Sequence, residues 1–200
     1  MKSLLIYLLA FTLIATQFSC KKNDSNPVVD NANAGVYLWP LNTANNWIFK
    51  TIVYDTVGAV KFTSYDTILV GRDTTISSQK WFQAMDKNVF WTNKTDGVWQ
   101  IDFGGSNQTA QLLFKFPGNV GDNWTTRDGQ ASIVSTNASI SLSSSTYTCY
   151  EYTSDYGLGH TENDYFKSGV GPILIEEFTK TNSGLQYKVY RRELISYTLK

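Results

Sequence analysis

The chain has 200 residues, and its 17 Lys and Arg residues balance 17 Asp and Glu residues, so its formal charge at pH 7 is zero. This balance provides no basic surface of the kind that attracts nucleic acid, and we expect no nucleic-acid partner. Aromatic residues are abundant, with 6 Trp, 12 Tyr and 11 Phe, and no motif predicts a cofactor.

The first 19 residues have the three parts of an export signal. Lys2 provides the cationic start, an apolar run extends from Leu4 to Ala15, and the small residue Ser19 precedes Cys20. The uncharged stretch is shorter than the roughly 20 residues that span a bilayer, which favours cleavage over a transmembrane helix. The junction resembles a bacterial lipoprotein signal, and this resemblance implies that Cys20 carries lipid.

A lipidated Cys20 would anchor the protein to a membrane without spanning it, because several acyl chains together bind a bilayer permanently. We therefore predict an outer-membrane lipoprotein that faces either the periplasm or the cell exterior, with the membrane as its partner. Residues 20–35 hold few bulky apolar side chains and many turn formers, and this composition predicts a flexible tether. Residues 36–200 are predicted to form a single β domain.

In this domain, runs of β-branched and aromatic residues alternate with clusters of Gly, Asn, Asp and Pro, which is typical of antiparallel β-structure. The predicted strands of the first half are 47–56, 60–70, 81–85, 89–93 and 98–103. Gly58 lies in the turn between the first two, where a glycine readily adopts a positive φ. Trp99, Ile101 and Phe103 share one face of the last strand, and we expect Trp99 to point inward.

The second half continues the pattern to a closing hairpin with a turn at 181–184. Its predicted strands are 110–118, a short one opening at 120–124, 146–152, 173–180 and 185–192, and the polar stretch 132–145 interrupts the β-pattern. Roughly ten strands of typical length fit the chain. Successive hairpins without a crossover helix predict an all-β, single antiparallel meander that curls into a barrel or half-barrel. A two-sheet β-sandwich is the alternative.

Three strings carry a resemblance to a known group of proteins. They are Trp39-Pro-Leu-Asn-Thr-Ala-Asn-Asn-Trp-Ile-Phe, Val120-Gly-Asp-Asn-Trp and Tyr165-Phe-Lys-Ser-Gly-Val-Gly-Pro-Ile-Leu-Ile-Glu-Glu. These are similar to the motifs PL-x-x-GN-x-W-x-Y, VGD-x-W and Y-x-x-GVG-x-I-x-x-E of uncharacterised secreted lipoproteins of Bacteroidota. The resemblance implies an envelope lipoprotein with a β domain, and it brings no catalytic residue.

Exposed tryptophans on such a domain could bind glycans, because sugar rings stack their apolar faces on aromatic rings. Trp39, Trp91 and Trp124 are the candidate ligand-binding residues. Core packing is the alternative role for these side chains, since large aromatic residues are mostly buried in folded domains.

The single histidine, His160, shares a short segment with Asp155, Glu162 and Asp164. Imidazole and carboxylate groups are ordinary ligands of zinc and manganese, so these four residues form a candidate metal site if the segment folds back on itself. A solvated loop explains the same residues without a metal.

Several catalytic patterns are incomplete. Three short strings, 77–80, 135–137 and 167–169, resemble in order the motifs of penicillin-recognising serine enzymes. Ser77 and Lys80, however, lie between two predicted strands, whereas those enzymes place the corresponding pair on a helix. We expect Cys149 to be an unreactive strand residue.

The other hydrolase patterns are also incomplete. Residues 104–108 fail the G-x-S-x-G pattern at the last position. Glu176 and Glu177 are adjacent on a predicted strand, so their side chains point to opposite faces and do not flank one glycosidic bond. We therefore expect a protein that is not an enzyme.

The sequence thus predicts an envelope-anchored lipoprotein whose non-catalytic β domain serves binding or scaffolding, with glycans as possible ligands. The alternative is a carrier that encloses a hydrophobic or lipid ligand in its curled sheet. Asp55-Thr, Asp66-Thr and Asp73-Thr also resemble O-glycosylation sites of exported Bacteroidota proteins. Threonine is common in strands for other reasons, which is the alternative explanation of these pairs.

Overall fold

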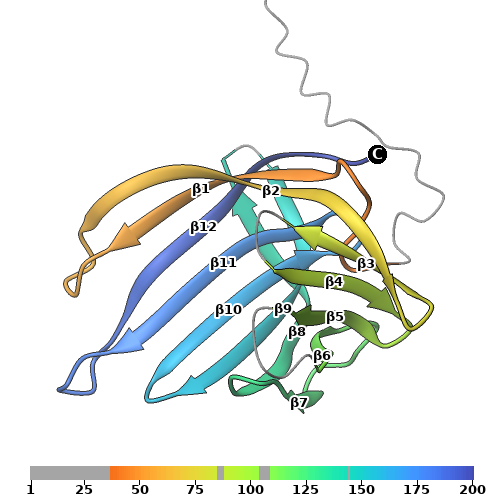
Figure 1. Cartoon of the computed structure of the whole chain (residues 1–200). Coiled ribbons are helices and arrows are strands. Elements are labelled where there is room, and N and C mark those ends of the chain that lie inside the picture. Colours follow the sequence, from red (N-terminus) through yellow and green to blue (C-terminus); the bar gives the residue numbers. More distant parts are fainter. Residues whose placement is uncertain (1–36, 85–87, 104–108, 144) are drawn as a thin grey trace, which may run out of the picture.

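In the computed structural model, the described residues 37–84, 88–103, 109–143 and 145–200 form one antiparallel sheet (Figure 1). The sheet has 12 strands, so the predicted all-β meander is confirmed with more strands than the roughly ten expected. The predicted signal peptide, Cys20 and the tether lie outside the described residues. Within the described part of the chain, no helix is long and apolar enough to cross a membrane.

The strands from β1 to β6, and again from β7 to β12, each pair with the next strand along the chain. Their bounds are β1 Asn46–Tyr54, β2 Val60–Ile76, β3 Gln79–Ala84, β4 Val89–Lys94, β5 Gly97–Asp102, β6 Gln111–Lys115, β7 Asn123–Thr125, β8 Gln130–Leu142, β9 Ser145–Gly157, β10 His160–Lys167, β11 Gly171–Lys180 and β12 Gln186–Thr198.

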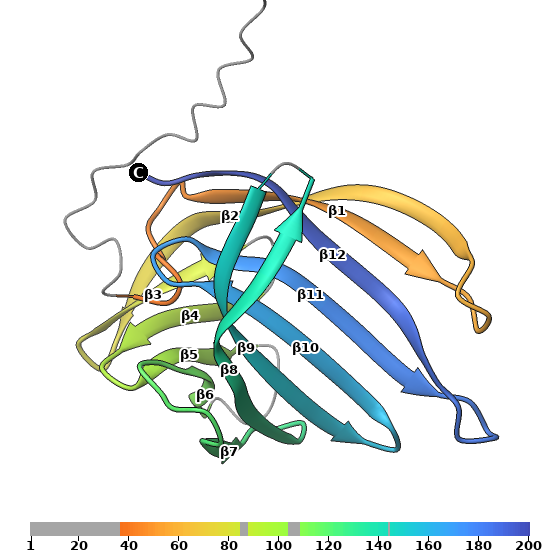
Figure 2. The same cartoon turned by 180° about the vertical axis from the view of Figure 1, so that it is seen from behind.

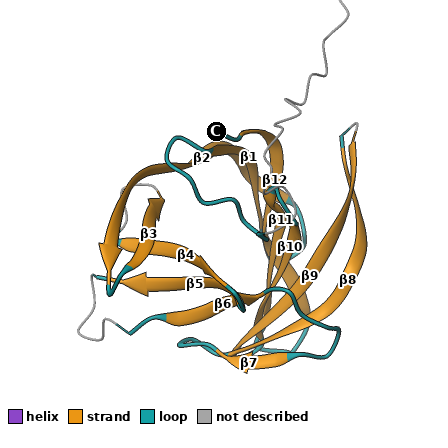
Figure 3. Ribbon diagram, turned by 90° about the vertical axis from the view of Figure 1, so that its right-hand side faces the viewer, coloured by secondary structure: helices purple, strands orange, loops and turns teal. Residues whose placement is uncertain are grey.

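The two halves of the meander join at β1, which pairs with β2 on one side and with β12 on the other. The edges of the sheet are therefore β6 and β7, and the sheet curls until these edges approach each other (Figure 3). The Tyr152 hydroxyl of β9 donates a hydrogen bond to the Lys115 carbonyl oxygen of β6 at 3.0 Å. Side-chain contacts thus complete a nearly closed barrel, and the alternative of a two-sheet sandwich is wrong.

Aromatic side chains pack inside the barrel. Successive residues of a strand point alternately inward and outward, so every second residue contributes to this core. In β1, Trp47 and Phe49 are fully buried, while Ile48 between them is exposed. Phe166 of β10 packs against Phe114 of β6, with ring centroids 4.4 Å apart. Burying each such side chain stabilises the fold by roughly 2–3 kcal/mol.

Residues 37–45, called the plug segment below, lead into β1 and run across one end of the barrel (Figure 3). Leu38, Trp39 and Leu41 are buried. The Asn93 side-chain amide of β4 donates to the Trp39 carbonyl oxygen at 2.8 Å. We call this end of the barrel the plugged end.

The C-terminus lies at the plugged end as well (Figures 1 and 2). Asn45 is fully buried and links the plug segment to the C-terminus. Its Nδ2 donates to the Pro40 carbonyl oxygen at 2.6 Å, and its Oδ1 accepts from the Lys200 backbone amide at 2.7 Å. The strand turns β1–β2, β9–β10 and β11–β12 lie at the opposite end, called the far end.

The two hairpin turns predicted from the sequence are confirmed. Gly58 has φ +84°, and the Asp55 side chain accepts from the backbone amides of Val57 and Ala59 at 2.9 and 2.8 Å. In the closing hairpin, the Gly184 amide donates to the Thr181 carbonyl oxygen at 2.9 Å. Both turns use the residue types that favour them, which is why their positions could be predicted.

Two strands run through segments that the sequence analysis did not predict as strands. The polar stretch 132–145 belongs largely to β8, which pairs with β9 along its length. The segment with His160, Glu162 and Asp164 is β10, so the prediction of a solvated loop there is wrong. Both strands carry many polar side chains, so their sequences lack the alternation of apolar and polar residues that usually predicts a strand.

Trp99 does not point toward the main core as expected. It packs with Ile101 and Phe103 in a smaller second cluster that also contains Trp81 and Phe90. The neighbouring residue Val98 belongs to the main cluster inside the barrel. The predicted alternation of β5 is therefore confirmed, but the face that carries Trp99 is the outer one.

Candidate functional site

The interior of the barrel contains a cavity of about 580 Å³. This volume is in the range of small-molecule sites, roughly 300–1,000 Å³. The exposed residue Asp128, in the β7–β8 turn, lies on its rim, so the cavity reaches solvent at the far end. Residues from both halves of the sheet form its wall, among them Trp39, Asp66, Trp91, Gln100, Leu113, Tyr156, Glu162, Asp164, Phe166, Tyr190 and Arg192.

Two of the three predicted ligand-binding tryptophans meet in this cavity. The ring centroids of Trp39 and Trp91 lie 4.5 Å apart with an interplanar angle of 37°. Trp91 Nε1 donates to Gln100 Oε1 at 3.1 Å, which holds an amide next to the indole. The prediction that Trp39 is exposed is wrong, because the plug segment carries its ring into the barrel, where it is 3% exposed.

Trp124, the third candidate, lies apart from the other two. It belongs to β7, is half-buried, and meets the Tyr152 ring edge-on at a centroid distance of 6.2 Å. It does not line the cavity. Its role in the structure is packing at the edge of the sheet, so it is not part of the candidate site.

One wall of the cavity carries an ion pair between β2 and β12. Arg192 Nε donates to Asp66 Oδ1 at 3.2 Å, and its terminal nitrogen donates to Asp66 Oδ2 at 2.6 Å. The guanidinium also lies over the Phe49 ring, 4.5 Å from its centroid. The two bonds fix the Arg192 plane, as is common for bidentate pairs of Arg with a carboxylate. Sequence reasoning missed Arg192, because nothing along the chain links it to Asp66.

The same side of the cavity carries the carboxyl groups of Glu162 and Asp164, two residues apart on β10, and β11 separates this strand from β12. Asp164 is 3% exposed, and its Oδ2 has no hydrogen-bond donor among the described residues. Burial raises the pKa of Asp164 well above its usual value, and the adjacent Glu162 raises it further. Burial also raises the pKa of Glu162, against hydrogen bonds from Tyr156 and Asp164 that lower it. Both shifts favour the protonated form of these carboxyl groups compared with exposed ones.

The four predicted metal ligands do not form one site. Asp155 is exposed, and its Oδ1 accepts from the Gly157 amide at 2.8 Å in the β9–β10 turn. His160 Nε2 lies 2.8 Å from Glu177 Oε1 of β11. Among the described residues, no three His, Cys, Asp or Glu side chains converge as metal ligands. Only Glu162 and Asp164 of the predicted set line the cavity.

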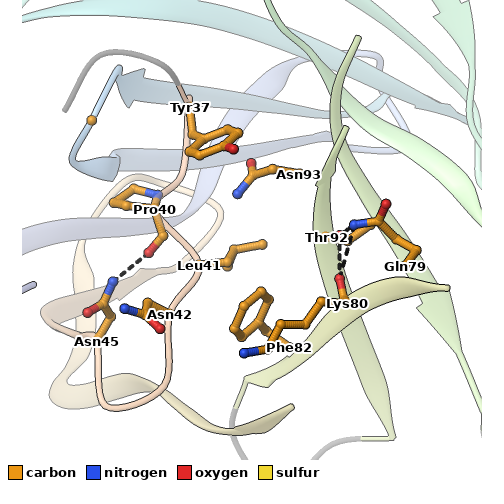
Figure 4. Close-up of a pocket in the computed structure, with 11 residues that line it drawn as sticks. Tyr37, Pro40, Leu41, Asn42, Asn45, Gln79, Lys80, Phe82, Thr92 and Asn93 are labelled. Carbon is orange, nitrogen blue, oxygen red and sulfur yellow. Dashed lines mark hydrogen bonds between the residues drawn. The ribbon is translucent and has the colours of Figure 1, made fainter. Parts of the chain in front are cut away.

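A second hollow of about 290 Å³ lies at the plugged end, between the plug segment and strands β3 and β4 (Figure 4). Tyr37, Leu41 and Phe82 line it together with several amide side chains. Its amides already serve the fold, since Asn45 holds Pro40 and Asn93 holds Trp39. The barrel interior, where Asp164 Oδ2 lacks such a partner among the described residues, is therefore the better candidate site.

The catalytic patterns can be placed in the fold. Ser77 lies in the β2–β3 turn with φ +49°, and Lys80 forms an ion pair with Asp73 at 2.8 Å. Ser77 thus lies between strands as predicted, whereas Lys80 lies on β3, and the pair is not on a helix. The segment 104–108 lies outside the described residues. Cys149 is buried, and burial raises the pKa of its thiol to about 12, which keeps it unreactive as predicted.

Glu176 and Glu177 point to opposite faces of β11, as predicted. Glu176 forms ion pairs with Lys188 and Arg191 of β12, whereas Glu177 contacts His160 of β10. Of the three predicted glycosylation positions, Thr56 and Thr67 are exposed and Thr74 is half-buried. Asp66, next to Thr67, lines the cavity.

No family model matches the chain, and no curated protein matches it. Two solved structures are similar in part. A candidate lipoprotein from Parabacteroides distasonis is 13% identical, with a TM-score of 0.42, over 81% of this chain and 98% of that protein. A candidate exported protein with a YmcC-like fold from Bacteroides fragilis is 10% identical, with a TM-score of 0.45, over 82% of this chain and 99% of that protein.

Proposed function

We propose that the protein is a lipoprotein of the cell envelope whose β-barrel binds a glycan in its interior cavity, without catalysing a reaction. The anchoring part rests on the export signal and on Cys20 directly after it. The binding part rests on one observation above all. The cavity combines the partly exposed ring of Trp91, which packs on the buried Trp39, with hydrogen-bonding side chains.

This combination suits a sugar better than a hydrocarbon. A sugar ring offers an apolar face to an indole and hydroxyl groups to carboxylates and amides. A fully apolar ligand would bury Asp66, Arg192, Glu162 and Asp164 against hydrocarbon, which costs several kcal/mol without compensating hydrogen bonds. A carrier of a lipid chain is therefore the less favoured function.

The anchor can be tested by growing cells with radiolabelled palmitate. We expect the label in the wild-type protein and none in Cys20→Ser, because serine cannot form the thioether. A wild-type protein that is exported but carries no label would contradict the proposed anchor.

The ligand can be tested by calorimetric titration of the purified protein with a panel of oligosaccharides. We expect one saturable site per chain, and Trp91→Ala should weaken binding about tenfold or more, since stacking on an aromatic ring contributes roughly 1–2 kcal/mol. Trp99→Ala is the matched control, because Trp99 lies close by on the outer face of the sheet. The proposal fails if no saccharide binds, or if both variants lose the same affinity.

A further inference from the structure

The charges around the cavity are unbalanced. Four of its lining residues are acids, namely Asp66, Asp128, Glu162 and Asp164, and Arg192 is the basic residue among them. Asp66 accepts hydrogen bonds from two nitrogens of the Arg192 guanidinium group. No cationic side chain of the cavity wall is left for the two carboxyl groups on β10.

Asp164 is the strongest sign that something is missing from the site. Its carboxyl group is buried, and in the described part of the chain neither Glu162 nor Asp164 forms an ion pair. Tyr156 donates to Glu162 Oε1 at 3.2 Å, but Asp164 Oδ2 receives no such bond. A buried carboxyl oxygen without a donor is unfavourable, and native structures usually supply a partner.

The side chains of the cavity indicate which chemical group could pair with Asp164. A divalent metal ion requires several ligands, and no three His, Cys, Asp or Glu side chains of the described chain converge. An organic ammonium group needs one or two carboxyl oxygens and benefits from aromatic faces. Tyr156, Tyr190 and Trp91 line the same cavity and provide such faces.

We propose that the cavity binds a ligand with a protonated primary amine, an amino sugar, whose ammonium group lies between Glu162 and Asp164. The inference rests on the proposed function and specifies its ligand class. In the empty cavity the raised pKa values favour a proton on this pair. The incoming ammonium replaces that proton, so the acid pair becomes two carboxylates and up to one proton passes to solvent.

Other titratable groups face this pair and contribute to the proton balance. They are Tyr152 and Tyr156 of β9, His160 of β10, Glu177 of β11, Tyr190 and Arg192 of β12, and Asp66 of β2. Because Arg192 is held by Asp66, and His160 lies against Glu177, neither takes the place proposed for the ligand.

The test is a calorimetric titration of the purified full-length protein with glucosamine oligomers and with their N-acetylated counterparts of equal length. We expect the free amines to bind at least about tenfold more tightly, as for a charge-assisted bond to a buried carboxylate. Titration in two buffers of different ionisation enthalpy should show proton release on binding of the amines, and none with the acetylated oligomers.

In Glu162→Gln, the amine and the acetylated oligomers should bind with nearly equal affinity. If Glu162→Gln does not fold, Asp164→Asn is measured in its place. Glu151→Gln, on the outer face of β9, is the matched control and should keep the preference. Equal binding of both oligomers, or a preference that survives Glu162→Gln, overturns the inference and leaves the proposed function standing. If neither oligomer binds, the glycan proposal and the inference both fail.

Discussion

Ala44 holds a backbone conformation that residues other than glycine seldom adopt. Its φ is +72°, and its amide donates to the Val70 carbonyl oxygen at 2.8 Å, which fixes the plug segment against β2. The left-handed region costs a residue with a Cβ about 1–2 kcal/mol.

Ala44→Gly should therefore stabilise the protein by about 0.5–1 kcal/mol, after the larger chain entropy of glycine in the unfolded state is subtracted. The measurement is the free energy of unfolding in urea. Ala59→Gly is the control. Ala59 lies in a turn and has no positive φ, so this substitution should lower the free energy of unfolding through the larger chain entropy of glycine. A loss of stability in Ala44→Gly would show that the conformation at position 44 is not strained.

Gly171 allows the plug segment to reach the core. It has φ +104°, and a Cβ there would lie 2.7 Å from Trp39 Cδ1 and 3.3 Å from Trp47 Nε1. Gly171→Ala should thus displace Trp39 and lower the free energy of unfolding by about 2–4 kcal/mol, the sum of overpacking and backbone strain. Gly121 has a similar φ of +89° but open space around it, so Gly121→Ala should lose only the stability that the backbone strain costs. Equal losses would contradict the packing argument.

The acid pair in the cavity predicts how stability depends on pH. The pKa values of Glu162 and Asp164 are raised on folding, so the folded state retains a proton that the unfolded chain releases. This contribution is complete below the ordinary values of 4.5 and 3.8, and it is lost as pH rises through the folded values. Asp164→Asn should remove most of this decrease in the free energy of unfolding with rising pH. Urea titrations at a series of pH values test this, and parallel curves for both proteins would refute it.

The sequence predicted only part of the site at this scale. Trp39 and Trp91 were chosen because an indole is the usual platform for a sugar, and both line the cavity. Glu162 and Asp164 were chosen as metal ligands, and the cavity brings them together without their predicted partners. Arg192 was missed, since its role depends on Asp66, 126 residues away in the chain.

At the scale of the elements, hairpins with clear turn residues and apolar strands were predicted well. β10 was not, because alternation normally signals a strand only when its inward face is apolar. The inward face of β10 carries Glu162 and Asp164 toward a polar cavity, so the segment has the composition of a loop. The same polarity that makes the strand hard to predict marks the wall of the site.

Asn45 joins the plug segment to the last strand, and its removal tests this contact. Asn45→Ala would leave the Pro40 carbonyl oxygen and the Lys200 amide without partners, which should cost about 2–3 kcal/mol of unfolding free energy. Asn42→Ala is the control. Its exposed amide also contacts Lys200, at 3.0 Å, and its loss should cost less than about 0.5 kcal/mol. Similar values for the two variants would mean that burial of Asn45 contributes nothing.

For the whole molecule, a meander was predictable from successive hairpins, but its closure was not. The pairing of β1 with β12 links residues from the two ends of the domain, such as Asn46 and Thr198, and no local signal specifies such a contact. The β6 edge is likewise joined to the other half of the sheet by the long-range contact of Lys115 with Tyr152 of β9. The cavity depends on this closure, so its position could not be inferred from the sequence.

The barrel also predicts how the protein is oriented on a membrane if Cys20 is lipidated. The described chain begins at Tyr37, whose carbonyl oxygen accepts from the Gly169 amide at 2.8 Å at the plugged end. The predicted tether between Cys20 and this point would span roughly 20–25 Å on average as a flexible coil. Strands such as β12 add about 40 Å between the two ends of the barrel. The plugged end should therefore lie near the bilayer, and the mouth of the cavity should point away from it.

Fluorophores attached at the two ends test this orientation in lipid vesicles. Thr95→Cys places a label in the β4–β5 turn at the plugged end, and Leu158→Cys places one in the exposed β9–β10 turn at the far end. Cys149 is buried and should not react. A quencher in the lipid phase should dim the label at position 95 more than the one at 158, because contact quenching requires close approach to the bilayer. Equal quenching, or stronger quenching at 158, would mean that the cavity opens toward the membrane and takes its ligand from there.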